Sequence, residues 1–208
     1  MDIAVIDYGI GNLRSAEKAL QRVGLDASLT TDPAALGRVK KIVLPGVGNF
    51  GECVKKLGEQ GFTQPLLAAV RAGTPLLGIC VGLQMLFESS EESPKSKGLG
   101  LLKGRVRRFS GGAFEGPEAL KVPHIGWNAL EFVARPHPLF NGIAPGSFVY
   151  FVHSYYACPE DAGTVLASSE YGGPFCAAAG AGNVMGTQFH PEKSQTAGLA
   201  ILKNFGEM

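Results

Sequence analysis

Residues 78–84 read Gly-Ile-Cys-Val-Gly-Leu-Gln and follow a short apolar run at 75–77, Pro-Leu-Leu. The pattern predicts a buried strand that turns sharply into a helix, with the turn centred on Cys80. Such a turn crowds the backbone, so a glycine is needed on each side of the central residue. The central side chain then stands at the N-terminus of a helix, where partial positive charge favours a thiolate. The stretch therefore predicts an α/β sheet with a reactive cysteine at its carboxyl edge.

The residues before this turn alternate between strand-like and helix-like segments. Helical spacing runs from Leu13 to Val23, with Asn12 as the expected N-cap, and recurs around 53–57 and 65–71. Alternating β and α units imply a mostly parallel sheet with helices on its faces. The apolar runs that predict the first strands are 3–6, 25–30 and 41–44.

The second half of the chain has a different pattern. Between 101 and 187, short strand-like runs alternate with turns rich in glycine and proline, which favours antiparallel strands added at a sheet edge. A last helix is expected at 197–205. The chain shows no repeat and no linker, so we expect one three-layer α/β domain around a central, mostly parallel mixed sheet. The strand-like runs are 105–109, 129–132, 148–156, 164–168 and 184–189.

Composition restricts the class of protein. Charged residues make up 18% of the 208 residues and the net charge is +1, so there is no basic excess for nucleic acid. No apolar stretch reaches the length of a membrane span, and the first residues lack the basic region of a signal peptide, so we expect a cytoplasmic protein. The four cysteines have no metal-ligand spacing, and we expect free thiols, no metal and no cofactor.

A cysteine nucleophile needs a base and a group that orients the base. Of the four histidines, His190 has the best setting, because it follows a strand-like run and precedes Pro191 and Glu192. The strand places His190 at the carboxyl edge of the sheet, and Glu192 lies on the same side of an extended chain. Together these motifs predict a catalytic triad of Cys80, His190 and Glu192. The remaining cysteines are interpreted as packing residues: Cys53, Cys158 and Cys176.

The two motifs together, 78–84 and His-Pro-Glu at 190–192, resemble those of the class I glutamine amidotransferases. Four further segments make the chain similar to one group in that family, the glutaminase subunits of imidazole glycerol phosphate synthases. The resemblance covers essentially the whole chain and implies one glutamine amidotransferase type 1 domain at 1–208, with a flavodoxin-like sheet. The four segments are 7–13 (Asp-Tyr-Gly-Ile-Gly-Asn-Leu), 45–52 (Pro-Gly-Val-Gly-Asn-Phe-Gly-Glu), 122–128 (Val-Pro-His-Ile-Gly-Trp-Asn) and 150–156 (Tyr-Phe-Val-His-Ser-Tyr-Tyr).

The resemblance implies hydrolysis of L-glutamine to L-glutamate and ammonia through a thioester on Cys80. His190 would transfer the protons and Glu192 would orient His190. Gln84 would bind glutamine one helical turn after Cys80. The backbone N–H groups of the oxyanion hole would come from Val47 and Val81. The other implied glutamine contacts are Gly48, Ser154 and Tyr155.

The Pro-Gly-Val-Gly strand at 45–48 suggests regulation. A peptide flanked by glycines rotates at low steric cost. The resemblance implies that the strand rests with an N–H turned away from the oxyanion hole until the partner subunit binds its nucleotide. Our hypothesis is that the N–H of Val47 is this switch.

The resemblance also implies a partner. The chain shows no second domain that could hold an ammonia acceptor, so the ammonia must pass to another protein. The implied partner is a cyclase subunit with a (β/α)₈ barrel, which forms a heterodimer and makes imidazole glycerol phosphate and aminoimidazole carboxamide ribotide in histidine biosynthesis. The resemblance places Pro123–Asn128 at the face that meets this partner, and the single tryptophan, Trp127, fits that role because tryptophan is enriched at interface hot spots.

Two alternatives remain. The chain could be the glutaminase component of anthranilate or aminodeoxychorismate synthase, although segment 7–13 argues against it. It could also be a non-catalytic binding module on the same fold, against which the intact triad argues. Two readings are open for His153, a buried core histidine or a neighbour of the glutamine pocket.

Overall fold

The computed structural model describes residues 1–132 and 137–208 and has the expected parallel first half. β1 (Ile3–Ile6) pairs in parallel with β2 (Ala27–Thr30) on one side and with β3 (Lys41–Gly46) on the other. β3 pairs in parallel with β4 (Leu76–Cys80). Every residue of β1, β3 and β4 is buried, as expected for parallel strands with helices on both faces.

The central sheet continues beyond β4 into the second half of the chain. β13 (Val184–Thr187) pairs in parallel with β4. β12 (Pro174–Ala181), β11 (Val165–Glu170) and β8 (Glu131–Phe132) then add antiparallel strands. The strand order is β2-β1-β3-β4-β13-β12-β11-β8, and its parallel part follows the flavodoxin-like order 2-1-3-4-5. The predicted α/β domain with a mostly parallel mixed sheet is confirmed.

The prediction for the strands of the second half was partly wrong. It grouped β13 with the antiparallel edge strands, but β13 lies inside the parallel part and is buried along its whole length. β12 was missed. Its middle residues, Phe-Cys-Ala-Ala-Ala-Gly at 175–180, are all buried, so the strand shows no polar alternation that would mark it in the sequence.

Two smaller sheets hold the other strand-like runs. The run at 148–156 divides at Ser154 into β9 (Phe148–His153) and β10 (Tyr155–Pro159). β9 pairs with β7 (His124–Ala129), and β10 pairs with β6 (Gly104–Arg108), which also pairs with β5 (Ser89–Ser90). β6, β9 and β10 come from runs that were expected at the edge of the central sheet, but they pair within these two smaller sheets instead. β5 was not predicted, and β7 shares only Ala129 with the predicted run 129–132.

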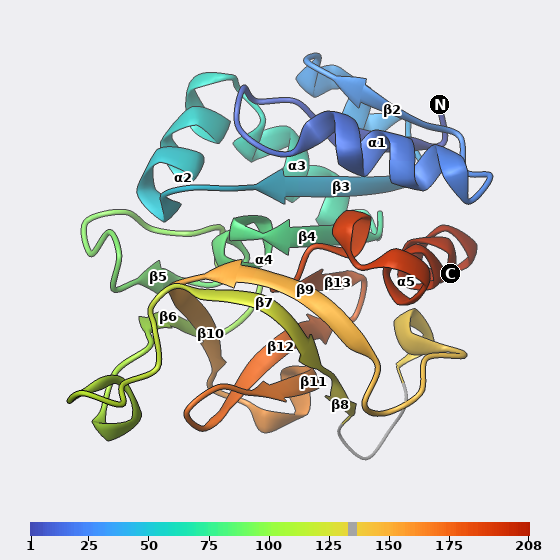
Figure 1. Ribbon diagram of the computed structural model, residues 1–208. Helices are drawn as coiled ribbons and strands as arrows, with labels where there is room; N and C mark the ends of the chain where they lie inside the picture. The colour runs from blue at the N-terminus through green and yellow to red at the C-terminus, as the bar shows by residue number, and fades with distance from the viewer. Residues whose placement is uncertain (133–136) are drawn as a thin grey trace.

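Helices cover both faces of the central sheet (Figure 1). α1 (Leu13–Arg22) and α5 (Gln195–Glu207) lie on the face nearer the viewer, and α2 (Phe50–Glu59) and α3 (Thr63–Arg71) lie behind it. The chain leaves β1 toward β2 but leaves β3 toward β4, in the opposite direction. Right-handed crossovers therefore place α1 and the α2–α3 pair on opposite faces. Within the described part of the chain, no helix has the length and apolar character needed to cross a bilayer.

Candidate active site

Cys80 lies at the turn between β4 and α4 (Val81–Met85) with its backbone in the left-handed region, at φ 57°. This conformation costs a non-glycine residue on the order of 1–3 kcal/mol. A Cβ at Gly78 would lie 2.6 Å from the carbonyl oxygen of Gly82, and a Cβ at Gly82 would overlap the carbonyl oxygen of Leu44. Both glycines are therefore needed for the turn that holds Cys80.

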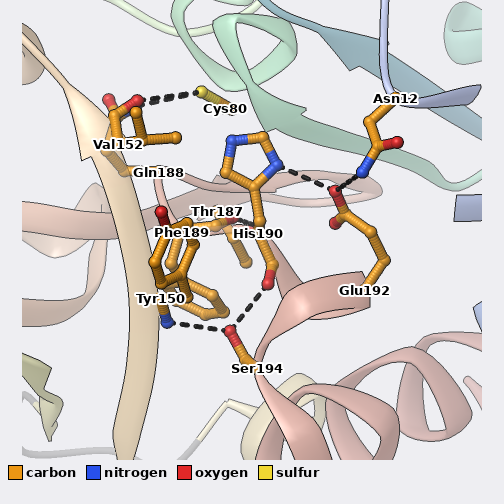
Figure 2. Close-up of polar contacts among 10 residues, drawn as sticks. All are labelled: Asn12, Cys80, Tyr150, Val152, Thr187, Gln188, Phe189, His190, Glu192 and Ser194. Carbon is orange, nitrogen blue, oxygen red and sulfur yellow. Dashed lines mark hydrogen bonds and ion pairs between the residues drawn. The ribbon is translucent and has the colours of Figure 1, made fainter. Parts of the chain in front are cut away.

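His190 lies between Cys80 and Glu192 (Figure 2). Its Nδ1 is 2.8 Å from Oε1 of Glu192, and both side chains are buried. A carboxylate only accepts hydrogen bonds, so Nδ1 carries the proton and Nε2 is left on the side of Cys80. In the described structure Nε2 forms no hydrogen bond, so it is available to a reacting group.

The charge state of His190 follows from its neighbours. Burial lowers the pKa of His190, but the Cys80 and Glu192 side chains raise it by more, to about 10. A raised pKa favours the imidazolium, so His190 can carry a proton on Nε2 as well as on Nδ1. The arrangement is suited to nucleophilic catalysis by Cys80 with His190 as its proton partner.

The turn that carries His190 is attached to β9. The N–H of His190 donates to the carbonyl oxygen of Tyr150. The hydroxyl of Ser194 donates to the carbonyl oxygen of His190 at 2.7 Å and accepts from the N–H of Tyr150 at 3.0 Å. Figure 2 shows both bonds. Ser194 was not predicted, because its partner strand is distant in the sequence.

Asn12 has a different role from the one expected. It precedes α1, but its side chain makes no capping hydrogen bond. Instead its Nδ2 donates to Oε1 of Glu192 at 3.1 Å (Figure 2). The segment 7–13 therefore reaches the back of the predicted triad, a link that the resemblance of this segment did not reveal.

A pocket of about 270 Å³ opens beside Cys80. Every residue predicted for the site lines this pocket except Glu192, which lies behind His190. The predicted residues in its lining are Val47, Gly48, Cys80, Val81, Gln84, Ser154, Tyr155 and His190. Across residues 1–132 and 137–208, no cluster of histidine, cysteine and acidic side chains could hold a metal ion.

The pocket also receives Glu92, which was not predicted. The polar sequence of the stretch 88–97 predicts a solvated connection. Instead Glu92 lines the pocket and accepts from the N–H of Phe50 at 2.6 Å, while the hydroxyl of Ser93 accepts from the N–H of Gly51. The loop thus satisfies free N–H groups at the start of α2. No local pattern marks this contact between segments that are far apart in the sequence.

The 45–48 strand lies directly against the nucleophile turn. A Cβ at Gly46 would be 2.7 Å from the backbone nitrogen of Gly82. Tyr8 donates to the carbonyl oxygen of Pro45 at 2.8 Å, and the thiol of Cys53 donates to the carbonyl oxygen of Val47 at 3.3 Å. Cys53 is buried, as expected of a packing residue, and it also fixes this carbonyl.

β7 has one buried and one exposed side. His124 points inward, and its Nδ1 lies 3.1 Å from Nε2 of His153. Burial lowers the pKa of His124 to about 4 and that of His153 to about 3, so both are neutral at pH 7. His153 is both a buried core residue and part of the pocket lining. On the outer side, Trp127 is 44% exposed and lies near two other exposed apolar residues, Ile125 and Phe148.

Comparison with known proteins shows which family the chain belongs to. The family model described as glutamine amidotransferase class-I matches residues 4–208. The imidazole glycerol phosphate synthase subunit HisH of Syntrophotalea carbinolica is 54% identical, over 99% of this chain and 100% of the relative. The subunit of the same name from Geobacter sulfurreducens is 52% identical, over 99% and 98%.

Solved structures share the fold at lower sequence identity. A glutamine amidotransferase crystal structure superposes with a TM-score of 0.75 at 23% identity, covering 99% of this chain and all of that one. A PurLQS structure from Thermotoga maritima gives 0.73 at 22% identity, covering 98% and 96%. The family match spans almost the whole chain and includes the Cys80 turn and the His190–Glu192 pair, and the chain belongs to the class-I glutamine amidotransferases.

Proposed function

We propose that this protein is the glutaminase subunit of an imidazole glycerol phosphate synthase, and that residues 1–208 act as one glutamine amidotransferase domain. It hydrolyses L-glutamine and supplies ammonia for histidine biosynthesis. The observation that carries the proposal is a strained Cys80 that lies beside His190 in the lining of a pocket (Figure 2). The chain that holds it is 54% identical to a synthase subunit of this name.

The first half-reaction forms a thioester. The Sγ of Cys80 attacks the side-chain amide carbon of glutamine, and a tetrahedral intermediate forms. His190 then delivers the proton on its Nε2 to the leaving nitrogen, so that the C–N bond breaks and ammonia departs. Glu192 holds the other ring nitrogen at 2.8 Å and keeps the ring in the reactive orientation.

The second half-reaction returns the enzyme to its starting state. Neutral His190 takes a proton from water as the oxygen attacks the thioester carbon. The C–S bond breaks, glutamate leaves, and Cys80 is again paired with protonated His190. In both halves the negative charge on the oxygen is stabilised by the N–H groups of Val47 and Val81, and loss of one such donor costs roughly 3–4 kcal/mol in the barrier.

The pocket lining matches a free amino acid. Gln84 donates through Nε2 to the carbonyl oxygen of Tyr155 and to Oε1 of Gln188, which leaves its own Oε1 for the substrate. Glu92 adds a carboxylate for the substrate α-ammonium group. The backbone of Gly48 and of Ser154 and Tyr155 completes the contacts. Together these groups orient the substrate amide at Cys80.

The partner is a cyclase subunit with a (β/α)₈ barrel, which forms a heterodimer with this chain in the cytoplasm. It receives the ammonia and makes imidazole glycerol phosphate and aminoimidazole carboxamide ribotide. The exposed apolar side of β7 and β9, around Trp127, is the docking face that we assign to it. Binding of nucleotide by the cyclase turns the N–H of Val47 into the oxyanion hole and excludes water.

The test is a glutaminase assay of the wild type and of Cys80→Ala, with and without the cyclase subunit and its nucleotide. We expect low activity alone, strong stimulation by the loaded cyclase, and no activity in the variant. Cys176→Ala is the matched control, since Cys176 is buried in β12 outside the pocket and its loss should leave the rate unchanged.

Each part of the proposal has its own contrary result. Wild-type activity in Cys80→Ala would exclude Cys80 as the nucleophile. A lack of stimulation by the cyclase would exclude the pathway and favour an anthranilate or aminodeoxychorismate partner. A free subunit with the Val47 N–H already directed at Cys80 would exclude the switch.

A further inference from the structure

We propose that Gln188 is a positioning residue, which donates a hydrogen bond from Nε2 to the Sγ of Cys80 and holds the thiolate in place for attack. This role rests on the proposed function, because it serves the nucleophile of that reaction. Gln188 follows β13, two residues before His190, and is fully buried. Its Nε2 lies 3.8 Å from the sulfur, a hydrogen-bonding distance for this large acceptor.

A chain of hydrogen bonds fixes the orientation of the Gln188 amide. The carbonyl oxygen of Tyr155 can only accept, so Gln84 must present its Nε2 there, at 3.0 Å. The same Nε2 donates to Oε1 of Gln188 at 3.1 Å. Gln188 therefore has its oxygen toward Gln84 and its Nε2 toward Cys80. A donor, not an acceptor, faces the sulfur.

The two buried histidines, His124 and His153, fix the far end of this series of hydrogen bonds. The Nδ1 of His153 lies 2.9 Å from the same carbonyl oxygen of Tyr155, so the histidine and Gln84 use both lone pairs of that oxygen. His153 then accepts at Nε2 from Nδ1 of His124. Both rings are neutral, so each donates once and accepts once along the chain. Gln84 cannot turn without leaving a buried acceptor unsatisfied, which is costly.

The sulfur has donors and an acceptor around it. Gln188 approaches it with an N–H group at 3.8 Å, and Nε2 of His190 lies on the same side of its ring as the sulfur (Figure 2). The carbonyl oxygen of Val152, at 4.0 Å, can accept from the neutral thiol only. A hydrogen bond to a charged acceptor is stronger than one to a neutral sulfur. The Gln188 donor therefore favours the thiolate over the thiol, and it weakens once the thioester has formed. The titratable groups that surround Cys80 are Tyr8, Cys53, Glu92, His153, His190 and, behind His190, Glu192.

The experiment measures the pH dependence of Cys80 alkylation by iodoacetamide, followed on the Cys80 peptide by mass spectrometry. Gln188→Met removes the donor at similar volume, and Gln188→Glu replaces the amide by a carboxylate. We expect the midpoint for Met to rise by about one pH unit, so that alkylation below it is about tenfold slower, with a larger rise for Glu. Gln60→Glu adds the same charge at the exposed end of α2 and should leave the curve unchanged.

Alkylation needs neither glutamine nor the cyclase, so it separates this proposal from the proposed function. A shifted curve in a protein that never hydrolyses glutamine would support the Gln188 contact and exclude the glutaminase. Identical curves for the wild type and Gln188→Met, with the fold intact by circular dichroism, would exclude the contact. If both variants unfold, the side-chain amide resonance of Gln188 in ¹⁵N-labelled wild type decides. Its chemical shift must change with pH at the midpoint of Cys80 alkylation. A chemical shift that stays constant through that pH range excludes the proposal.

Discussion

The first half of the chain, with its parallel strands, and the β-rich second half contribute to the site around Cys80 in different ways. The backbone at the end of β4 places the nucleophile. Gly78 and Gly82 have no Cβ, so the Cys80 turn can pack closely against itself and against β3. The second half brings side chains. His190 and Gln188 both follow β13, His153 ends β9, and hydrogen bonds hold all three side chains in place. The first arrangement depends on the absence of a Cβ, and the second on the presence of particular donors and acceptors.

This difference has consequences for the effects of substitution. A change in the parallel half should disturb the fold, because the crowded contacts are backbone contacts. A change in the polar network should leave the fold and alter charge, pH dependence or rate. Four predictions test this contrast.

The largest effect is expected for Gly82→Ala. The added Cβ would overlap the carbonyl oxygen of Leu44, so β3 or the Cys80 turn must move. We expect a loss of stability on the order of 4 kcal/mol or more, measured by urea unfolding. Gly112→Ala is the control in the second half, since no heavy atom of residues 1–132 or 137–208 beyond its own chain neighbours lies within 4 Å of its Cβ position, and it should be nearly neutral. Equal losses in the two variants would contradict the contrast.

Glu192→Gln should reduce the rate without unfolding the protein. The amide is similar in shape to the carboxylate but no longer stabilises a positive His190 or fixes its tautomer. We expect a loss of roughly 10³-fold in kcat, by analogy with the acid of other triads, and little change in urea midpoint. Steady-state assays with the cyclase present measure it. A rate within threefold of wild type would show that Glu192 does not orient His190.

Acid should destabilise the protein through the buried histidine pair. Unfolded histidines bind protons near pH 6.5, but the pKa values of His124 and His153 in the folded state are about 4 and about 3. The unfolded state thus binds more protons below pH 6.5, and the free energy of unfolding falls as pH drops toward 3. By pH 5 the loss is on the order of 2 kcal/mol per histidine.

Urea unfolding at pH 7, 6 and 5 tests this dependence. The double variant His124→Phe, His153→Phe should lose less stability on acidification than the wild type, although it starts less stable at pH 7. An equal loss in both proteins would assign the acid sensitivity to other groups.

The smallest effect is expected for Asn12→Ala. It removes one hydrogen bond from Oε1 of Glu192, while the bond to His190 remains. We expect about a tenfold loss in kcat, because a charge-assisted hydrogen bond contributes roughly 1.5–3 kcal/mol and part of it is replaced by water. Asn12 is the N-cap of α1 but its side chain makes no capping hydrogen bond, so the stability of α1 should change little. A fall in thermal midpoint with an unchanged kcat would show a structural role only.

Much of the parallel half could be predicted because its signals are local. The run at 3–6 matches β1, the run at 41–44 lies within β3, and the turn at Cys80 follows from two glycines. The apolar residues at 83 and 85–87 predict that the helix after Cys80 continues through Phe87, but α4 ends at Met85. The strands of the second half could be recognised in part, but not their partners, because antiparallel pairing depends on which surfaces remain uncovered once the core has formed.

The sequence by itself determined the α/β class, the family and the residue types of the predicted triad, because glycine spacing and the His-Pro-Glu motif are local constraints on the chain. Only the tertiary structure decided that Asn12 reaches Glu192, that Glu92 enters the pocket and that Gln188 faces Cys80. The physical reason is that a buried polar atom must find a partner, and the partner is chosen by proximity in the folded protein, not by distance along the chain.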